Sequence, residues 1–248
     1  MSPKRAPGSD GAASAMPGGV WLRAPRPPSA GGGAAQPALD RERIVAASVA
    51  LLDERGTAGL TMRKLAEALG VHATSLYWHV AHRDDLLDLA LDAVFGEVTL
   101  PERAAGDWRA DVTAFMDGLR TALLRHPWSG ALAGSRPLLG PNALARSEFV
   151  YAALVGAGFR GDDLSAAAGA IANYVIGTVS AEAAWRHGDD ARDETAGRRA
   201  LLARLNGSAE AHPTLAAHPP SLRTDWEGHY ARGRDFLLAG LAGSRAGD

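Results

Sequence analysis

The chain has 248 residues, 46% of them hydrophobic and 22% charged, and its formal net charge at pH 7 is −2. This composition fits a globular protein of one or two domains, and its charge excludes a generally basic nucleic-acid-binding protein. The sequence contains no run of about 18 apolar residues, so we predict no membrane-spanning helix. The absence of cysteine excludes disulfides and thiolate chemistry and favours a cytoplasmic location.

Residues 1–38 are rich in Ala, Gly, Pro and Ser, and VWLRAP is their only apolar segment. They have no continuous apolar core of the kind that a signal peptide carries. Such a segment buries too little apolar surface to offset the entropy of ordering, so we predict a disordered tail. Its four basic residues leave two interpretations open, an inert tail or an accessory arm that contacts DNA phosphates.

A three-helix domain is predicted at residues 39–86. Apolar residues recur at helical spacing after Asp40, a suitable N-cap, and this first helix ends near Gly56. A second helix begins at Thr61 and is broken by a glycine, and a third follows at about residues 72–79. A fourth helix then opens with two aspartates and carries apolar residues on one face.

The second and third helices have the pattern of a helix-turn-helix. Leu65, Leu69 and Leu76 are spaced to fill a small shared core. Ala66 is small because the third helix crosses it at close range. Gly70 supplies the positive φ that the tight turn requires, which other residues adopt only at a cost.

With these positions facing inward, the third helix turns an unusually polar and aromatic surface outward. A helix fits the major groove of B-DNA, where hydroxyl groups reach base edges and methyl groups contact thymine. Tyr77 and His79 are suited to phosphate oxygens, as are Thr61 and Arg63 at the start of the second helix. The outward residues are His72, Ala73, Thr74, Ser75, Tyr77, Trp78 and His79.

An αα-hairpin that only packs is the alternative interpretation of these two helices. Residues 40–86 contain six basic and seven acidic side chains, so bulk charge does not explain DNA binding. We therefore expect local placement and two copies to supply the affinity, with a shallow salt dependence per subunit.

Residues 87–248 continue as helices, and no alternating strand pattern is present, which predicts an all-α protein. Helices are expected at 108–127, 142–156, 163–186 and 222–242. A loop is expected between the last two, with one helix near 195–205. The long helix is rich in Ala and Gly, which lets helices approach closely, so it and the last helix are candidates for an intersubunit four-helix bundle. Tight packing within one subunit is the alternative.

The stretches GLTMRKLAEALGV and LYWHV resemble the DNA-binding domain of the tetracycline-repressor (TetR) family across residues 40–95. LLRHP, GSRP and YVIG extend the resemblance more loosely to the tetracycline-repressor-like C-terminal domain. The resemblance implies a homodimeric transcriptional repressor that binds a palindromic operator and is released by a small molecule. The DNA contacts that it implies are Thr61, Met62, Arg63, Ala73, Thr74, Ser75, Tyr77, Trp78, His79 and Arg83.

Two departures from the tetracycline repressors change the expected partners. Those proteins read bases with Gln-Pro where this chain has Ala73 and Thr74, so the operator should differ. Phe115 and Leu132 align with the Asn and His that hold the drug and its Mg²⁺, so we do not expect a magnesium–tetracycline complex. An apolar effector chamber remains, although each candidate is as well explained by ordinary core packing. The candidates are Trp108, Phe115, Met116, Leu119, Trp128, Leu132, Arg136, Phe149, Asn173, Tyr174, Thr178 and Trp185.

No catalytic or metal-binding constellation is predicted. His79 with His82, and His212 with His218, lack cysteine or a nearby acidic partner, so we expect no metal and no cofactor. No residue pairs a nucleophile with a base. The leading hypothesis is a cytoplasmic homodimeric repressor in which a small hydrophobic effector in residues 87–248 shifts the fourth helix as a lever. A helical enzyme or carrier with an incidental αα-hairpin, and an activator or global regulator, are the alternatives.

Overall fold

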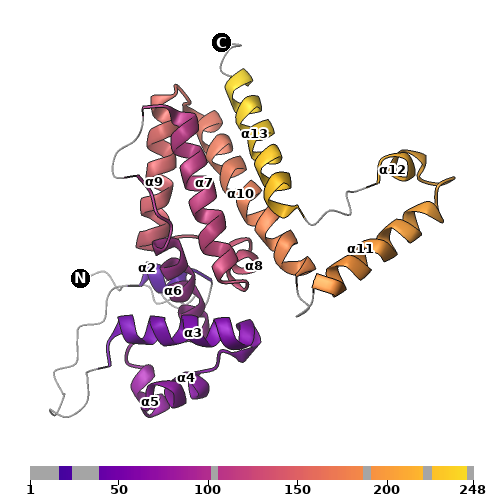
Figure 1. Cartoon of the computed structure of the whole chain (residues 1–248). Helices are drawn as coiled ribbons and strands as arrows, with labels where there is room; N and C mark the ends of the chain where they lie inside the picture. The colour runs from indigo at the N-terminus through magenta and orange to yellow at the C-terminus, as the bar shows by residue number, and fades with distance from the viewer. Residues whose placement is uncertain (1–16, 24–38, 102–105, 187–190, 220–224, 245–248) are drawn as a thin grey trace, which may run out of the picture. The chain divides into compact units, whose positions relative to one another are not determined.

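The computed structural model describes residues 17–23, 39–101, 106–186, 191–219 and 225–244 (Figure 1). These residues form twelve helices, and no strand occurs among them, which confirms the all-α prediction. The chain divides into two units, Met1–Ile176 and Gly177–Asp248, and each is described separately.

The predicted helix-turn-helix is formed by α3, Arg41–Gly59, α4, Met62–Leu69, and α5, Ala73–Leu76. Asp40 caps α3 by accepting the Arg43 N–H at 2.7 Å. Thr61 Oγ1 likewise accepts the Lys64 N–H of α4 at 3.2 Å. These short-range bonds explain why the caps of both helices are visible in the sequence.

Glycines set the direction of the chain at both predicted positions. Gly56 has φ 64° and ψ −177°, so α3 kinks where the sequence predicted its end and then continues to Gly59. Gly70 lies in the left-handed region, with φ 67° and ψ 31°, as the turn requires.

The helix α5, the third helix of the predicted domain, is shorter than the predicted range 72–79. The α-helix ends at Leu76, and the next three residues form turns. The Leu76 carbonyl oxygen accepts the N–H groups of both His79 and Val80 at 2.9 Å, so the chain continues in tight turns to Val80.

The helix α6, Arg83–Gly96, is the central element of the first unit. It packs against α2, α3, α7, α8 and α9, and all but a few of its residues are buried. Three of its buried residues are aspartates, Asp85, Asp88 and Asp92. Because buried carboxylates require partners, these three positions show where other elements attach to α6.

A helical layer beside α6 completes the first unit. It contains α7, Trp108–Arg125, α9, Pro141–Gly156, and the first part of α10, Gly161–Trp185, near the boundaries predicted from the sequence. The short α8, Ser129–Ala133, lies between the helices expected at 108–127 and 142–156. Met116 and other fully buried side chains form the core of this layer.

The second unit contains the rest of α10, α11, Ala191–Asn206, α12, Pro213–Ala217, and α13, Trp226–Ser244. Arg198 stacks on Trp185 and Trp226, with its guanidinium carbon 5.2 and 5.0 Å from the two ring centroids. The Trp226 indole N–H also donates to a Glu194 carboxylate oxygen at 2.9 Å. This cluster joins α11 to α10 and α13. The helix predicted near 195–205 is present as α11, and the predicted loop also contains the short α12.

Among the described residues, α10 is long and apolar enough to cross a membrane when judged by length and composition alone. An 18-residue window of its 25 residues has a mean hydropathy of 1.3, and a third of that window is buried. No membrane-spanning helix was predicted from the sequence. A core or interface helix of a globular protein has the same composition, and α10 contains the buried Glu182.

The segment predicted to be a disordered tail contains one ordered element. Residues 17–23 are described, and α2, Gly19–Leu22, packs against α6. Disorder does not hold at these seven residues, because Gly18 and Arg23 pair with buried carboxylates of α6. The rest of the predicted tail lies outside the described residues.

Candidate functional site

The third helix and the turn after it present the predicted surface to solvent. Tyr77 is 49% exposed and Trp78 is 65% exposed, whereas Leu76 and Val80 are buried beneath them. His72, Thr74 and His79 are also exposed, while Ala73 and Ser75 are half-buried instead of fully outward. Exposed aromatic side chains gathered on one surface often mark a site of interaction, so this surface is the candidate nucleic-acid interface.

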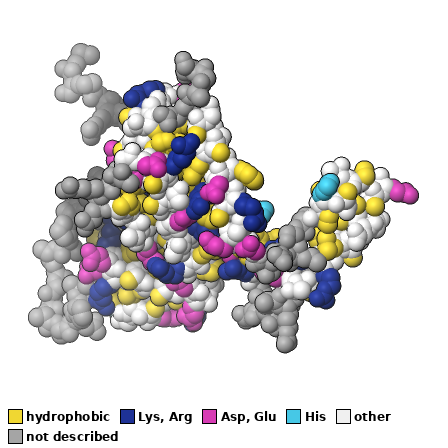
Figure 2. Space-filling model, turned by 45° about the horizontal axis from the view of Figure 1, so that its top comes forward, with side chains coloured by type: hydrophobic (Ala, Val, Ile, Leu, Met, Phe, Trp, Pro, Cys, Tyr) yellow, Lys and Arg dark blue, Asp and Glu magenta, His cyan; other side chains and the backbone are white. Residues whose placement is uncertain are grey.

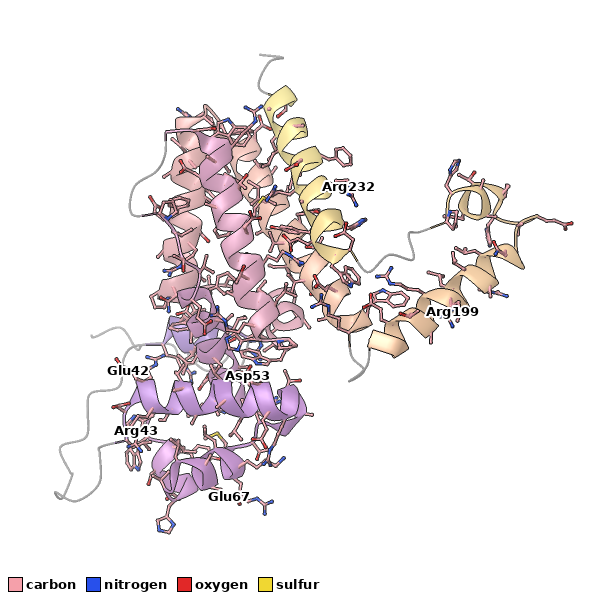
Figure 3. The ribbon with its side chains drawn as sticks, in the orientation of Figure 1. Glu42, Arg43, Asp53, Glu67, Arg199 and Arg232 are labelled. Carbon is pink, nitrogen blue, oxygen red and sulfur yellow. The ribbon has the colours of Figure 1, made fainter. Side chains whose placement is uncertain are left out.

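The start of α4 adjoins this interface in sequence. Thr61 is exposed and caps the helix, so its backbone and hydroxyl lie at the positive end of the helix dipole. Arg63 has a side chain 83% exposed and lies 3.6 Å from Glu67, which Figure 3 labels on α4. This pair is loose and solvated, so the guanidinium is available for a phosphate. Met62 is half-buried.

Arg83 has a structural position that the sequence analysis did not predict. Its Nε donates to the Leu60 carbonyl oxygen at 2.8 Å, and its Nη2 donates to the Thr57 carbonyl oxygen. These carbonyls lie at the carboxyl end of α3, where helical partners are missing. Arg83 therefore joins the start of α6 to the end of α3, and its phosphate contact stays a prediction.

Charges of both signs are mixed on the face of the molecule that Figure 2 shows. In the view of Figure 2, Lys and Arg side chains alternate with Asp and Glu side chains across the visible face. This distribution agrees with the net charge of −2. Any DNA affinity must therefore come from the local placement of a few side chains, as the sequence predicted.

A polar cluster joins α3 of the helix-turn-helix to the end of α7. Asp53, labelled on α3 in Figure 3, accepts the Trp128 indole N–H at 2.7 Å. His126 is 5% exposed, and its Nδ1 lies 2.8 Å from Asp53 while its Nε2 lies 3.0 Å from Glu97. Glu97 directly follows α6 and also pairs with Arg125. One histidine thus connects three helices that belong to the predicted DNA-binding and effector regions.

Replacement of Asp53 by alanine is expected to destabilise the protein by about 1–2 kcal/mol, because the buried Trp128 and His126 each lose an acceptor. Thermal and urea unfolding would measure this loss. Glu54→Ala is a matched control, because the neighbouring Glu54 side chain is 63% exposed and pairs only with Arg55 in the described contacts. Equal stability of the two variants would contradict a structural role for the cluster.

A groove is present between α7, α9 and α10 of the first unit. Its volume is about 220 Å³, and no charged side chain lines it. Two aromatic residues and two serines lie among small residues of α10. The lining residues are Phe115, Ser147, Val150, Tyr151, Ser165, Ala168, Gly169 and Ala172.

Among the predicted effector residues, all of which the structure describes, only Phe115 lines this groove. Met116 and Leu119 are fully buried in the core, so the apolar stripe of α7 mainly serves packing. Trp128 is bonded to Asp53, and Trp108 packs edge-on against Phe159 with ring centroids 6.0 Å apart.

Arg136, one of the predicted effector residues, points instead to α6. Its guanidinium donates to Asp88 Oδ1 at 2.7 Å and also pairs with Asp84. Trp185 stacks on Arg198 in the second unit. The other candidates lie outside the groove lining, half-buried except for the exposed Asn173, and they are Leu132, Phe149, Asn173, Tyr174 and Thr178.

Some of the residues that line the groove belong to a sequence pattern that was interpreted in another way. Ala168 and Gly169 belong to the small-residue pattern that predicted a dimer helix, whereas here they form one wall of the groove. Ser147 and Tyr151 are four residues apart on α9, the spacing of one helix face. Neither feature indicates a ligand site until the three helices are brought together.

The model of bacterial regulatory proteins of the tetR family matches residues 44–90, and that of the tetracyclin repressor-like C-terminal domain matches residues 100–244. The chain belongs to the TetR family of transcriptional regulators. This TetR-family protein is therefore a transcription regulator with a DNA-binding helix-turn-helix domain, in a family that is not enzymatic. The resemblance identified in the sequence is confirmed.

Three similar proteins place it within the family. An HTH-type transcriptional regulator of Saccharopolyspora erythraea is 53% identical over 91% of this chain and 92% of that protein. The class A tetracycline repressor from transposon 1721 in Escherichia coli is 35% identical over 59% of this chain and 68% of its own. The Streptomyces coelicolor protein ActR, solved in complex with actinorhodin, has a TM-score of 0.75 at 28% identity and covers 86% of this chain and all of its own.

Proposed function

We propose that this TetR-family regulator is a repressor that binds a palindromic operator as a homodimer and is released by a small hydrophobic effector. The observation that carries the proposal is the outward-facing aromatic and hydroxyl surface of α5 and the following turn, with Tyr77 and Trp78 about half exposed or more. We assign DNA binding to residues 39–86, and effector binding and dimerisation to residues 87–248. The cytoplasm, which contains bacterial DNA, is the location that this role requires.

Base reading and phosphate contact divide between α5 and the start of α4. The N-terminal residues of a recognition helix reach base edges, which favours the short side chains of α5 for reading sequence. Tyr77, His79 and Arg63 have the donors that position a protein on phosphates. The proposed contacts are Thr61, Met62, Arg63, Ala73, Thr74, Ser75, Tyr77, Trp78, His79 and Arg83.

Dimerisation is supported by apolar surface on the two last long helices. Phe236 of α13 is 77% exposed, and the small residues Gly177 and Ala181 are exposed on α10. Exposed apolar side chains of this size are typical of interfaces between subunits. A dimer also multiplies the weak affinity of a single helix-turn-helix for half of an operator.

The groove chemistry favours a neutral, planar aromatic effector with hydroxyl or carbonyl groups. Phe115 and Tyr151 offer aromatic surface, Ser147 and Ser165 offer hydroxyls, and the α10 wall is shallow because Gly169 has no side chain. ActR, the similar protein, was solved with actinorhodin. Drug-sized sites usually enclose about 300–1,000 Å³, so a ligand must widen this groove of about 220 Å³.

Hydrogen bonds between helices transmit a widening of the groove to the DNA-binding helices. The start of α9 is bonded to Asp92 of α6, which accepts the Asn142 Nδ2–H at 3.1 Å and the Ala143 N–H at 2.9 Å. Displacement of α9 therefore pulls on α6, and α6 holds α3 through Arg83. The resulting coupling between effector and operator is typically about 1–3 kcal/mol and acts equally in both directions.

Operator binding is tested by selecting duplexes from a library of palindromic sequences and measuring the affinity of the selected duplex by fluorescence anisotropy. A scrambled duplex of the same length is the control. A specific Kd at least about 10³-fold below that for the scrambled duplex supports the proposal. Equal binding of both duplexes would refute it.

Gly169→Leu is expected to block the effector groove without disturbing the fold. A Cβ at Gly169 meets no other heavy atom within 4 Å, so the new side chain occupies open space. A panel of planar aromatic compounds, with actinorhodin and tetracycline plus Mg²⁺ included, would be tested by thermal shift. Compounds that stabilise the wild type should bind Gly169→Leu at least tenfold more weakly, while operator affinity stays unchanged.

Gly156→Leu serves as the matched control for this substitution. A Cβ at Gly156, the last residue of α9, also meets nothing within 4 Å, but Gly156 does not line the groove. Compound binding should be retained in this variant. Undiminished compound binding by Gly169→Leu would place the effector site elsewhere, and tight binding of magnesium-bound tetracycline would overturn the interpretation of Phe115 and Leu132.

A further inference from the structure

The short helix α2 is attached to α6 by two buried aspartates. The Gly18 N–H donates to Asp88 Oδ2 at 2.8 Å, and Arg23 pairs with Asp85. The two carboxylates lie almost one turn apart on α6, and their residues are only 4% and 3% exposed. Since a buried carboxylate needs specific partners, these bonds define one position of residues 18–23, the N-terminal strap, along α6.

The strap shares its attachment point with the loop that follows α8. Asp88 accepts Gly18 through one carboxylate oxygen and Arg136 through the other. Burial raises the pKa of Asp88, while the Gly18 and Arg136 hydrogen bonds act in the opposite direction. The strap and the loop therefore stabilise the same ionised side chain, so loss of either one weakens the hydrogen bond between the other and Asp88.

Trp21 lies where three parts of the first unit meet. Its ring borders a cavity of only about 10 Å³ together with Leu91 and Phe95 of α6 and Pro137 of the loop. The Arg41 guanidinium, at the first residue of α3, lies over the ring with its carbon 5.5 Å from the centroid. A single side chain thus contacts Arg41 of α3 and shares a small cavity with residues of α6 and of the loop after α8.

We propose that Trp21 is a positioning residue for operator binding, which acts by holding α3 against α6 and not by contact with DNA. Two recognition segments must fit groove faces that lie about 34–36 Å apart or a multiple of this distance. When α3–α5 move relative to α6, operator binding must stop this motion, and the conformational entropy that is lost lowers the affinity. The inference rests on the proposed operator binding, but it concerns a part of the chain that the proposed DNA contacts do not include.

The first test compares Trp21→Ala with Leu22→Ala in the full chain. Leu22 belongs to the same short helix but is 59% exposed, so it reports the effect of substitution alone. Trp21→Ala should bind the selected operator at least fivefold more weakly and should speed amide hydrogen exchange in α6. Trp21→Phe, which keeps an aromatic face for Arg41, should recover most of the affinity. Wild-type affinity and unchanged α6 exchange in Trp21→Ala would overturn the proposal.

Salt dependence separates positioning from direct contact with DNA. Removal of a phosphate contact lowers the slope of log Kd against log salt, whereas loss of positioning weakens binding and leaves the slope unchanged. Trp21→Ala should therefore show the wild-type slope. A shallower slope would mean that the N-terminal segment itself touches DNA. Absence of operator binding by the wild type would instead refute the proposed function.

A disulfide provides an independent test, because the chain has no native cysteine. A Cβ placed on Gly18 lies 3.4 Å from the Pro137 Cβ, close to the 3.5–4.5 Å typical of disulfides. Gly18 has φ +81°, so Gly18→Cys is strained in both redox forms, and the comparison is made between oxidised and reduced Gly18→Cys/Pro137→Cys. The oxidised form should bind the operator at least as tightly as the reduced form. Weaker binding on oxidation would show that the strap must leave for DNA to bind, contrary to the proposal.

Discussion

Replacement of Thr74 and Tyr77 by alanine together should lower operator affinity by about 100-fold, the largest functional effect expected of any change in this chain. Thr74 is exposed within α5, where a hydroxyl and a methyl group reach base edges, and Tyr77 follows at the end of the helix. Each such contact typically contributes about 1–3 kcal/mol, and a loss of about 3 kcal/mol in total corresponds to this factor. Fluorescence anisotropy with the selected operator measures it.

The fold itself should tolerate this double substitution. Tyr77 is 49% exposed and Leu76, which anchors α5 in the core, is unchanged. The melting temperature should therefore stay close to that of the wild type. Glu54→Ala, an exposed change on α3, controls for general effects on the helix-turn-helix. Unaltered operator affinity in a folded Thr74→Ala/Tyr77→Ala variant would mean that this surface does not read DNA.

Asp92→Ala is expected to give the largest loss of stability, about 3 kcal/mol. Asp92 is 6% exposed and caps α9 from outside the helix, accepting the Ala143 N–H at 2.9 Å and the backbone and side-chain N–H groups of Asn142 at 3.3 and 3.1 Å. Hydrogen bonds to a charged group contribute more than neutral ones, and an uncapped buried helix end leaves its donors without partners. The midpoint of urea unfolding measures the change.

Two further variants make this prediction specific. Asp92→Asn keeps one acceptor oxygen and should lose about half as much stability as Asp92→Ala. Glu148→Ala, at an exposed position of α9, should have almost no effect. A loss below about 1 kcal/mol for Asp92→Ala would show that α9 does not depend on α6 for its start, and the proposed route from effector to DNA would lose its connection.

The buried aspartates of α6 explain how one helix is connected to several other elements. Asp85 binds the strap, Asp88 binds the strap and the loop after α8, and Asp92 binds the start of α9. These three positions lie on one helix face because they are spaced by three and four residues. Each is costly to bury without its partner, so movement of any partner changes the favoured position of α6.

Much of the DNA-binding domain was predictable from the sequence because its chemistry is local. Asp40 and Thr61 cap helices that begin next to them, and Gly70 makes its turn by its own backbone conformation. Leu65 and Leu76 are spaced for burial, and both are buried. Such signals involve residues within a few positions of one another, and the family resemblance reinforced them.

The groove between α7, α9 and α10 and the ordering of residues 17–23 depend on contacts between residues far apart in the chain. Composition predicted disorder near Gly18, and the partner that orders it, Asp88, lies 70 positions later. Arg136 was predicted to bind the effector, but its guanidinium is bonded to aspartates of α6. The groove lies where Tyr151 of α9 and Gly169 of α10 come together. The sequence by itself thus determined the long helices, the caps of α3 and α4, and the exposed aromatic and hydroxyl surface of α5 and the following turn. Only the tertiary structure decided which partners the buried charges have and where a groove lies between the helices, because both depend on how distant segments pack.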